Sequence, residues 1–163
     1  MAELKDSGAR RQFESGAVRD IADGKGRCDL LPLDVVSDLL DNEVMEHIDV
    51  YVRRGSVISL HTAIELFVND HRVWPDIYTA ILEVAKQYED GAKKYNDRNW
   101  EKGIPVHCFI DSGVRHYLKW LRGDEDEPHD RAFIWNMLGA IWTHKNKPEL
   151  IDLPFKDTEK ESE

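Results

Sequence analysis

The chain has 163 residues, of which 41% are hydrophobic, and this is enough to bury the core of one compact domain. Acidic residues outnumber basic ones by 32 to 22, and the formal net charge of −10 argues against a protein that binds duplex phosphates over a broad surface. No apolar run approaches the roughly 18 to 20 residues that cross a bilayer, which argues against a membrane protein.

The cysteine pattern and the N-terminus indicate the compartment. Cys28 and Cys108 lie far apart and have no CxxC or Cys/His spacing of a metal site. The N-terminus lacks the basic and then apolar pattern of a signal peptide. We therefore expect a reduced, cytoplasmic protein.

The first part of the chain changes from polar to periodic. Residues 1–22 are polar without apolar periodicity, and we expect them to be flexible or to pack only on a partner. Between residues 35 and 48, apolar side chains recur at intervals of three and four, which predicts a helix. Residues 50–60 are interpreted as an extended piece or a loop before a second helix through Ile64 and Phe67.

The rest of the chain carries three clearer helical patterns. Pro75 is placed like the first residue of a helix, and one face then stays apolar as far as Gly91. Further apolar stripes run over residues 110–123 and 128–145, and no alternating strands or hairpin signals are found. The prediction is an all-α fold, a compact bundle of about five helices over residues 23–150, followed by a solvated acidic tail at 151–163.

A first group of carboxylates lies on the helix after Pro75. Glu83 and Asp90 are seven residues apart and share a helix face, with Glu89 beside them. The ordinary interpretation is a solvated face on which Lys86 and Lys93 are ion-pair partners.

A second group lies in the stretch GDEDEPHD, residues 123–130. The ordinary interpretation is a run of acids that favours a helix N-terminus. If the two groups lie on helices that face each other, their carboxylates supply the hard oxygen ligands that Mg²⁺ requires, and substrate phosphates complete the octahedron.

Histidines, cations and one tryptophan lie near these acids. His116 and His129 flank the second group, and each is either a structural histidine or a group that orients a carboxylate or donates to a phosphate. Arg115 and Lys119 are the nearest cations. Trp100 follows NDRN in an expected loop, where its ring could stack on a base.

Several well-known catalytic motifs are absent from the sequence. The glycine-rich stretch GKGRCDLLP, residues 24–32, lacks the GxxxxGK[ST] and GxGxxG spacings, so neither a Walker loop nor a Rossmann loop is predicted. There is also no GxSxG, HExxH or zinc quartet.

Three blocks together carry a family resemblance: GKGRCDLLP, LEVAKQYEDGAKKYNDRNWEKGIP and DSGVRHYLKWLRGDEDEPHDRAFIWN. They resemble the phage-borne dATP/dGTP diphosphohydrolase family, which is grouped with the all-α MazG-like nucleotide pyrophosphohydrolases. The resemblance covers residues 24–32 and 82–136, and residues 33–81 look like an insertion. It implies an enzyme that uses Mg²⁺, or Mn²⁺ as an alternative, to convert dGTP or dATP to the monophosphate and pyrophosphate.

The resemblance also implies a biological setting. In some phages this reaction feeds the synthesis of DNA that contains 2-aminoadenine. The partners would be purine deoxynucleotides rather than polymeric nucleic acid, in the cytoplasm of the host.

Site residues follow from the same resemblance. The MazG-like signature is ExxE on one helix and ExxD on another; Glu127 and Asp130 match ExxD, whereas the first helix offers only Glu83 and Glu89 at another spacing. These four are the expected metal ligands. The expected substrate-binding residues are Lys93, Arg98 and Asn99 for phosphates or sugar, Tyr95 or Trp100 for the purine, and Lys119 and Asn136.

The expected reaction is metal-assisted attack of water on the α-phosphorus. His116 and His129 are the catalytic candidates, and His116 or a carboxylate would position the water. Two alternatives stay open: an HD-type hydrolase that releases triphosphate, suggested by the dipeptide His129-Asp130, and a nucleotide-binding module without turnover. The surplus of apolar stripes further predicts a homodimer or homotetramer.

Overall fold

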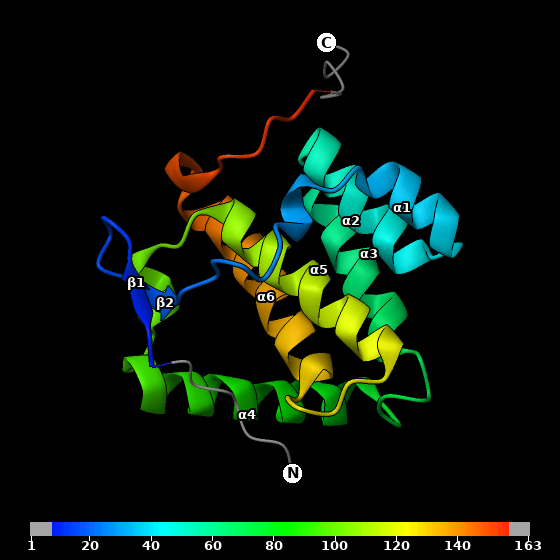
Figure 1. The fold of residues 1–163 in the computed structure, drawn as a ribbon. Coiled ribbons are helices and arrows are strands. Elements are labelled where there is room, and N and C mark those ends of the chain that lie inside the picture. Colours follow the sequence, from blue (N-terminus) through cyan, green and yellow to red (C-terminus); the bar gives the residue numbers. More distant parts are fainter. Residues whose placement is uncertain (1–7, 157–163) are drawn as a thin grey trace.

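The computed structural model describes residues 8–156, and this part of the chain folds into six α-helices, three short 3-10 helices and one two-stranded sheet (Figure 1). The α-helices are α1 (Leu33–Leu40), α2 (Glu43–Arg54), α3 (Val57–Val68), α4 (Ile77–Tyr95), α5 (Val106–Arg122) and α6 (His129–Asn146). The prediction of a compact helical fold is confirmed. No helix in the described residues combines the length and the apolar character needed to cross a bilayer.

Helices α5 and α6 form the centre of the molecule and pack against each other (Figure 1). Their close approach depends on Gly139, because a Cβ atom there would lie 2.3 Å from the ring of Phe109. The two helices are consecutive in the chain, so the end of α5 lies next to the start of α6. This arrangement brings His116 and His129 together.

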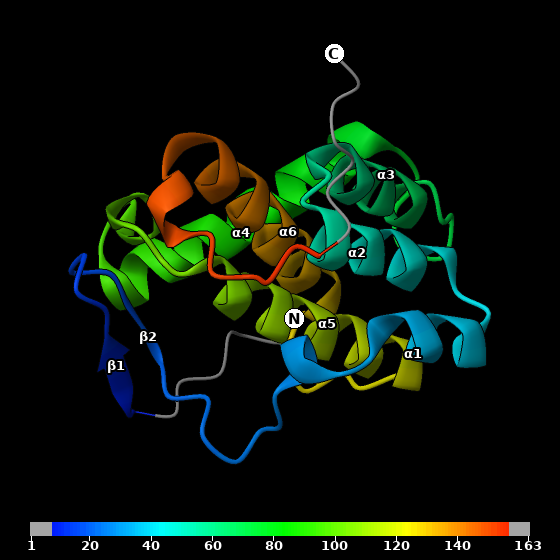
Figure 2. The same ribbon diagram turned by 90° about the horizontal axis from the view of Figure 1, so that it is seen from above.

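Helices α1 to α3 cover one side of this central pair (Figure 2). The ring of Phe67 on α3 packs edge-on against Trp120 and Phe133, with centroid distances of 4.9 and 5.0 Å. The single helix predicted over residues 35–48 is wrong. Asp41 adopts a left-handed conformation with φ of 47°, and the Asn42 side chain caps α2 by accepting from the Met45 amide at 2.9 Å.

Helix α4 runs across one end of the bundle and packs on α6 (Figure 1). It begins after Asp76, whose side chain accepts a hydrogen bond from the Thr79 amide at 2.7 Å. The helix continues through Gly91, where we expected its apolar face to end, and reaches Tyr95. This extra turn carries Tyr95 toward the N-terminal strands.

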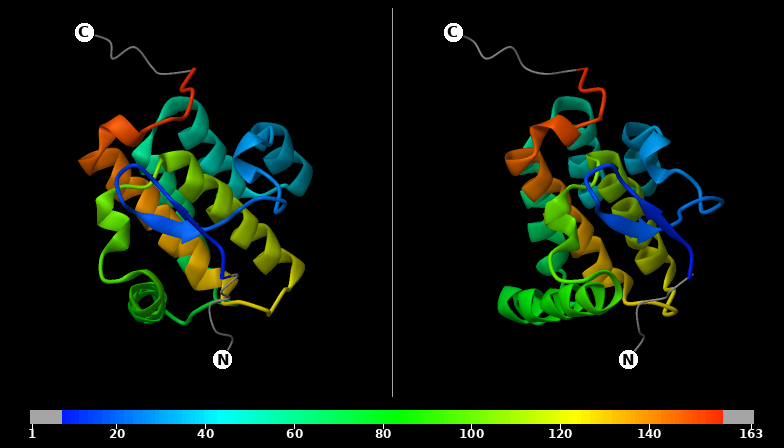
Figure 3. Two further views of the ribbon diagram at one scale, coloured as in Figure 1. Left: turned by 60° about the vertical axis from the view of Figure 1, so that its left-hand side comes forward. Right: turned by 90° about the vertical axis from the view of Figure 1, so that its left-hand side faces the viewer.

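Strands β1 (Arg10–Gln12) and β2 (Val18–Asp20) form an antiparallel hairpin that the sequence did not predict (Figure 3). Distant side chains hold it. The Asn99 amide donates to the Val18 carbonyl and accepts from the Val18 amide, both at 2.8 Å. Asp20 accepts from the Tyr95 hydroxyl at 2.8 Å and from Lys94 Nζ at 2.6 Å. Strands of three residues are too short to show an alternation of apolar and polar side chains. The hairpin is therefore determined by these long-range contacts rather than by a local sequence pattern.

The segment after α6 also packs on the molecule as far as the structure describes it. The ring of Phe155 lies 5.8 Å from that of Tyr51, and the Lys156 amide donates to the Arg53 carbonyl at 2.9 Å. Residues 151–156 therefore lie on the helical domain, although we expected a solvated tail. The expectations for residues 1–7 and 157–163 fall outside the described residues.

Candidate active site

A cavity of about 440 Å³ lies between the hairpin, the C-terminal half of α4, the 3-10 helix Asn99–Lys102 and the central pair α5 and α6. Its aromatic lining consists of Tyr88, Tyr95, Trp100 and Trp135. Its cationic lining consists of Arg11, Arg19, Lys25, Lys94, Arg98, Arg115 and Lys119. A hollow with aromatic rings and an excess of cations suits a small anionic ligand that has an aromatic part.

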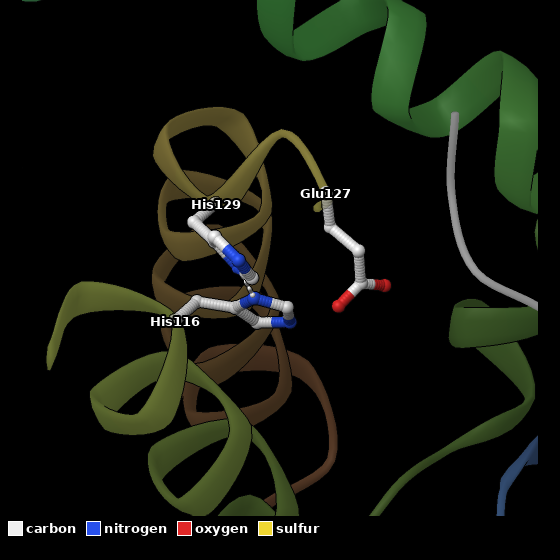
Figure 4. A group of neighbouring side chains, drawn as sticks. All are labelled: His116, Glu127 and His129. Carbon is white, nitrogen blue, oxygen red and sulfur yellow. Dashed lines mark hydrogen bonds between the residues drawn. The ribbon is translucent and has the colours of Figure 1, made fainter. Parts of the chain in front are cut away.

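Two histidines meet at the edge of the cavity, and one of them, His116, lines it (Figure 4). His116 on α5 and His129 at the start of α6 approach through their Nδ1 atoms, which lie 2.9 Å apart. The other nitrogen of His129, Nε2, lies 2.7 Å from Oδ1 of Asp126. The three side chains therefore form a chain of hydrogen bonds. Its two ends, His116 and Asp126, line the cavity, whereas His129 between them is buried.

The hydrogen-bond network assigns the tautomers. An ionised carboxylate can only accept, so Nε2–H of His129 donates to Asp126. When His129 is neutral, its Nδ1 accepts from Nδ1–H of His116, which leaves Nε2 of His116 with a lone pair. In Figure 4 this nitrogen faces the carboxylate of Glu127.

The environment keeps the His116 ring neutral. Burial lowers the pKa of His116 to about 3, and the charges of His129, Arg19, Lys119 and Arg115 act in the same direction. A neutral imidazole with an unprotonated nitrogen can bind a metal or accept a proton.

The donor set fits a divalent metal. Ligand atoms of His116, Glu127 and His129 all lie within 4.8 Å of one another, and the same holds for Asp124, Asp126 and His129. Both nitrogens of His129 already take part in hydrogen bonds, so Glu127 and His116 are the stronger ligand pair. One carboxylate with one imidazole suits Mn²⁺ well, whereas Mg²⁺ prefers oxygen ligands and would rely more on substrate phosphates.

The structure does not bring the four predicted metal ligands together. Only Glu127 lines the cavity. On α4, Glu83 lies 2.5 Å from Lys86 and Glu89 lies 3.9 Å from Lys93, and neither carboxylate lines the cavity. The ordinary interpretation of this group, ion pairs along one helix, describes their positions.

Two more acids of the predicted groups are engaged elsewhere. Asp90 pairs with Arg131 at 2.7 Å. Asp130 accepts from the Arg131 amide at 2.7 Å in the first turn of α6 and does not line the cavity. The ExxD match of the sequence thus contributes only its glutamate to the cavity wall.

The predicted substrate-binding residues mostly line the cavity. Those that do are Tyr95, Arg98, Asn99, Trp100, Lys119 and Asn136, whereas Lys93 does not. Asn99 and the Tyr95 hydroxyl are engaged with the hairpin, so their polar atoms serve to position β2. The ring of Trp100 packs edge-on against Trp142 at a centroid distance of 5.0 Å, which fixes it in the wall.

Sequence reasoning missed three residues of the site. Arg11 and Arg19 lie in the segment expected to be flexible, and the turn residues Ser15 and Gly16 between them were the only local signal of a hairpin. Asp126 was read only as one of several acids. Its spacing of three residues from His129 at the start of α6 is the signal that could have identified it.

Comparisons with known proteins agree with the resemblance noted in the sequence. A family model described as dATP/dGTP diphosphohydrolase, N-terminal, matches residues 70–153, which is more than half of the chain. This range includes α4, α5 and α6 with His116, Glu127 and His129, and it leaves out the hairpin and α1 to α3. No curated protein and no solved structure matches the chain. The chain belongs to the dATP/dGTP diphosphohydrolase N-terminal family.

Proposed function

We propose that this protein hydrolyses dGTP or dATP to the deoxynucleoside monophosphate and pyrophosphate, with Mg²⁺ or Mn²⁺ as the metal. The family supports a dATP/dGTP diphosphohydrolase activity. The observation that carries the proposal is the meeting of Glu127 and His116 beside a cavity lined by cations and aromatic rings. The size of the cavity, about 440 Å³, is in the range that small-molecule sites occupy.

Each group at the site has a proposed task. Glu127 and Nε2 of His116 would hold the metal, which when bound would polarise phosphoryl oxygens and offset the charge that develops on them. Asp126 and His129 orient the His116 ring through their hydrogen bonds. Lys119 and Arg115 on α5 attract the triphosphate.

The aromatic wall would receive the purine. Trp135 on α6 and Trp100 line the same cavity, and the purine of dGTP or dATP would pack against their part of the wall. We further infer, from the family resemblance alone, that the reaction feeds the phage synthesis of DNA that contains 2-aminoadenine, in the host cytoplasm.

Product analysis tests the reaction. The protein is incubated with each of the eight common NTPs and dNTPs, with EDTA, Mg²⁺ or Mn²⁺, and the products are separated by ion-exchange chromatography. We expect metal-dependent release of dGMP or dAMP with pyrophosphate. Nucleoside plus triphosphate would indicate the HD-type reaction, and no metal-dependent hydrolysis of any nucleotide would indicate a binding module.

We also propose that the protein is a homodimer or homotetramer that pairs through α4. Tyr78, Ile81 and Leu82 are 77%, 61% and 69% exposed, and with Ala85 they form an apolar stripe at helical spacing. A second copy of the same helix would cover such a stripe. Light scattering should give a multiple of the single-chain mass of 18.9 kDa, and Leu82→Glu should lower it. A wild-type mass of one chain would rule out the assembly.

A further inference from the structure

Two arginines face each other across the hairpin at the edge of the cavity. Arg11 and Arg19 are direct partners in the register of β1 and β2, and both line the cavity. Like charges placed directly opposite on two strands repel each other. Such a pair is favourable when an anion binds between or beside the two guanidinium groups.

Neighbouring side chains hold Arg19 in a fixed position. Its guanidinium lies over the rings of Phe109 and Trp135, 5.6 and 5.4 Å from their centroids. Its Nη2 donates to Oδ1 of Asn136 at 3.3 Å, and Asn136 in turn donates to the Ala132 carbonyl at 2.8 Å. The donor group is therefore oriented before any ligand arrives.

The protein satisfies the guanidinium groups at this wall only in part, since Arg19 donates to Asn136 and Arg115 pairs with Asp111 at 2.6 Å. Nη1 of Arg19, Nε of Arg11 and Nε of Arg115 are buried and have no hydrogen-bond partner. No carboxylate pairs with Arg19 among residues 8–156. A guanidinium nitrogen that is buried without an acceptor is costly, and burial lowers the pKa of Arg19. An anionic ligand would supply the missing charge and the missing acceptors.

We propose that Arg19 and Arg11 bind the pyrophosphate part of the substrate triphosphate, so that the hairpin forms part of the active site. This rests on the proposed function, because it assumes a nucleoside triphosphate. Planar guanidinium groups match phosphate oxygens in bidentate geometry. The aromatic rings and the amide of Asn136 hold Arg19 in the wall of the same cavity that His116 lines.

The hairpin lies outside the part of the chain that the family model matches, residues 70–153. The residues that fasten it, Tyr95 and Asn99, lie inside that part. The proposed phosphate contact is thus made by a segment outside the matched part and is positioned by residues inside it.

Calorimetric titration with inorganic pyrophosphate tests the proposal. The buffer contains EDTA, so that the metal site cannot contribute. We compare wild-type protein with Arg19→Gln, Arg11→Gln and Arg19→Lys, and deoxyguanosine serves as a second ligand without phosphates. Arg72→Gln is the matched control, because it removes an arginine charge at an exposed position away from the cavity.

Losing charge-assisted hydrogen bonds should weaken pyrophosphate binding by about tenfold to a hundredfold in Arg19→Gln, and by a smaller factor in Arg11→Gln and Arg19→Lys. Deoxyguanosine binding should not change, and Arg72→Gln should behave as wild type. If Arg19→Gln does not fold by circular dichroism, Arg11→Gln and Arg19→Lys decide.

Three results would overturn the proposal. The first is that the wild-type protein does not bind pyrophosphate, and the second is that the wild type and the folded arginine variants bind it with equal affinity. The third is that the variants lose only deoxyguanosine binding, which would place the purine at Arg19. The outcome is separate from the proposed function. Absence of dGTP hydrolysis would leave a measured pyrophosphate site, whereas hydrolysis with unchanged pyrophosphate affinity would reject only the arginine contact.

Discussion

The two acidic groups of this chain look alike in the sequence and differ in the structure. On α4, Glu83 and Glu89 lie next to lysines three and four residues further on and stay outside the cavity. Between α5 and α6, Asp126 and Glu127 lie beside histidines, and both line the cavity.

The difference teaches that the residues next to a carboxylate decide whether it lines the cavity, more than its position in a spacing motif does. A glutamate with a lysine at i+3 or i+4 on the same helix has a local partner and tends to remain on the surface. A carboxylate followed within three residues by a buried histidine has a partner that points inward. His129 is 2% exposed, and its hydrogen bond to Asp126 holds that carboxylate at the edge of the cavity, although the Asp126 side chain remains 37% exposed.

The largest expected effect comes from Glu127→Gln, which directly tests the acidic group between α5 and α6. The change keeps the shape of the side chain and removes the charge that would hold the metal. We expect kcat/KM for dGTP to fall by a factor of 100 or more, because losing a metal-bound carboxylate removes several kcal/mol of transition-state stabilisation.

The matched control for this variant is Glu125→Gln, which changes an exposed acid two residues earlier that does not line the cavity. It should retain wild-type activity. A Glu127→Gln protein that is folded by circular dichroism and keeps more than about a tenth of the activity would contradict the ligand assignment.

The second effect separates charge from hydrogen bonding at Asp126. Asp126→Ala leaves Nε2–H of His129 without its acceptor, so the His116 ring loses its orientation. We expect activity or metal affinity to fall by about tenfold to a hundredfold. Asp126→Asn retains an acceptor oxygen and should restore part of the loss. Nitrogen-15 NMR of the imidazoles gives an independent readout, since Nε2 of His116 should be unprotonated in the wild type and mixed in Asp126→Ala.

Activity of Asp126→Ala within twofold of the wild type, with an unchanged His116 tautomer, would show that the hydrogen-bond chain has no positioning role.

The helices were predictable because their signals are local. Apolar periodicity and terminal signals such as Pro75 and Gly123 gave the helices from residue 75 to residue 146 with small errors at the ends. The break between α1 and α2 was missed because the apolar stripe continues across it. The signal there is the pair Asp41-Asn42, in which a left-handed residue precedes an N-cap.

The site was predictable only in part, because its geometry depends on long-range contacts. His116 and His129 were proposed from residue type and neighbourhood, and Glu127 from the ExxD match. The structure places ligand atoms of the three within 4.8 Å of one another. The hairpin arginines could not be found in this way. Their position depends on contacts of Asn99 and Tyr95 with strands about 80 residues earlier, which no local pattern encodes.

Another carboxylate, Asp152, also forms a hydrogen bond with a histidine but lies outside the cavity. It therefore tests a carboxylate–histidine pair where no ligand is expected. Asp152 accepts from the His107 ring and from the His107 amide at 2.9 Å. The hydrogen bond that the His107 ring donates to Asp152 raises the pKa of His107 to about 10. Burial alone raises the pKa of Asp152, but the hydrogen bonds from His107 outweigh it and lower the pKa below 3.8.

The sign of the pH dependence follows from these shifts. The raised pKa of His107 stabilises the fold fully below its unfolded value of about 6.5, and the effect is lost as the pH rises toward 10. The lowered pKa of Asp152 stabilises the fold above its unfolded value of 3.8, and this is lost in more acidic solution. His107→Gln should therefore lower Tm most between about pH 4 and pH 6.5.

The deficit in Tm should be about 1 to 4 °C, because a partly exposed ion pair contributes at most about 1 kcal/mol. Thermal unfolding followed by circular dichroism at several pH values measures it. A deficit that is constant from pH 6 to pH 10 would mean that His107 acts only through packing.

The smallest expected effect is at the acidic group on α4. It bears most directly on the comparison between the two acidic groups. Glu83→Gln and Glu89→Gln each remove one surface ion pair on α4, with Lys86 and Lys93 respectively. Such pairs contribute about 0.3 to 0.5 kcal/mol, so Tm should fall by less than about 2 °C and kcat/KM should stay within about twofold of the wild type. Titration of Mn²⁺, followed by calorimetry, should give the same affinity in both variants. If either variant instead loses activity and Mn²⁺ affinity by more than tenfold while it remains folded, the α4 carboxylates reach the metal in the active enzyme. The two acidic groups would then act together, as the MazG-like pattern implies, and α4 would have to rotate or slide on α6 to bring them face to face.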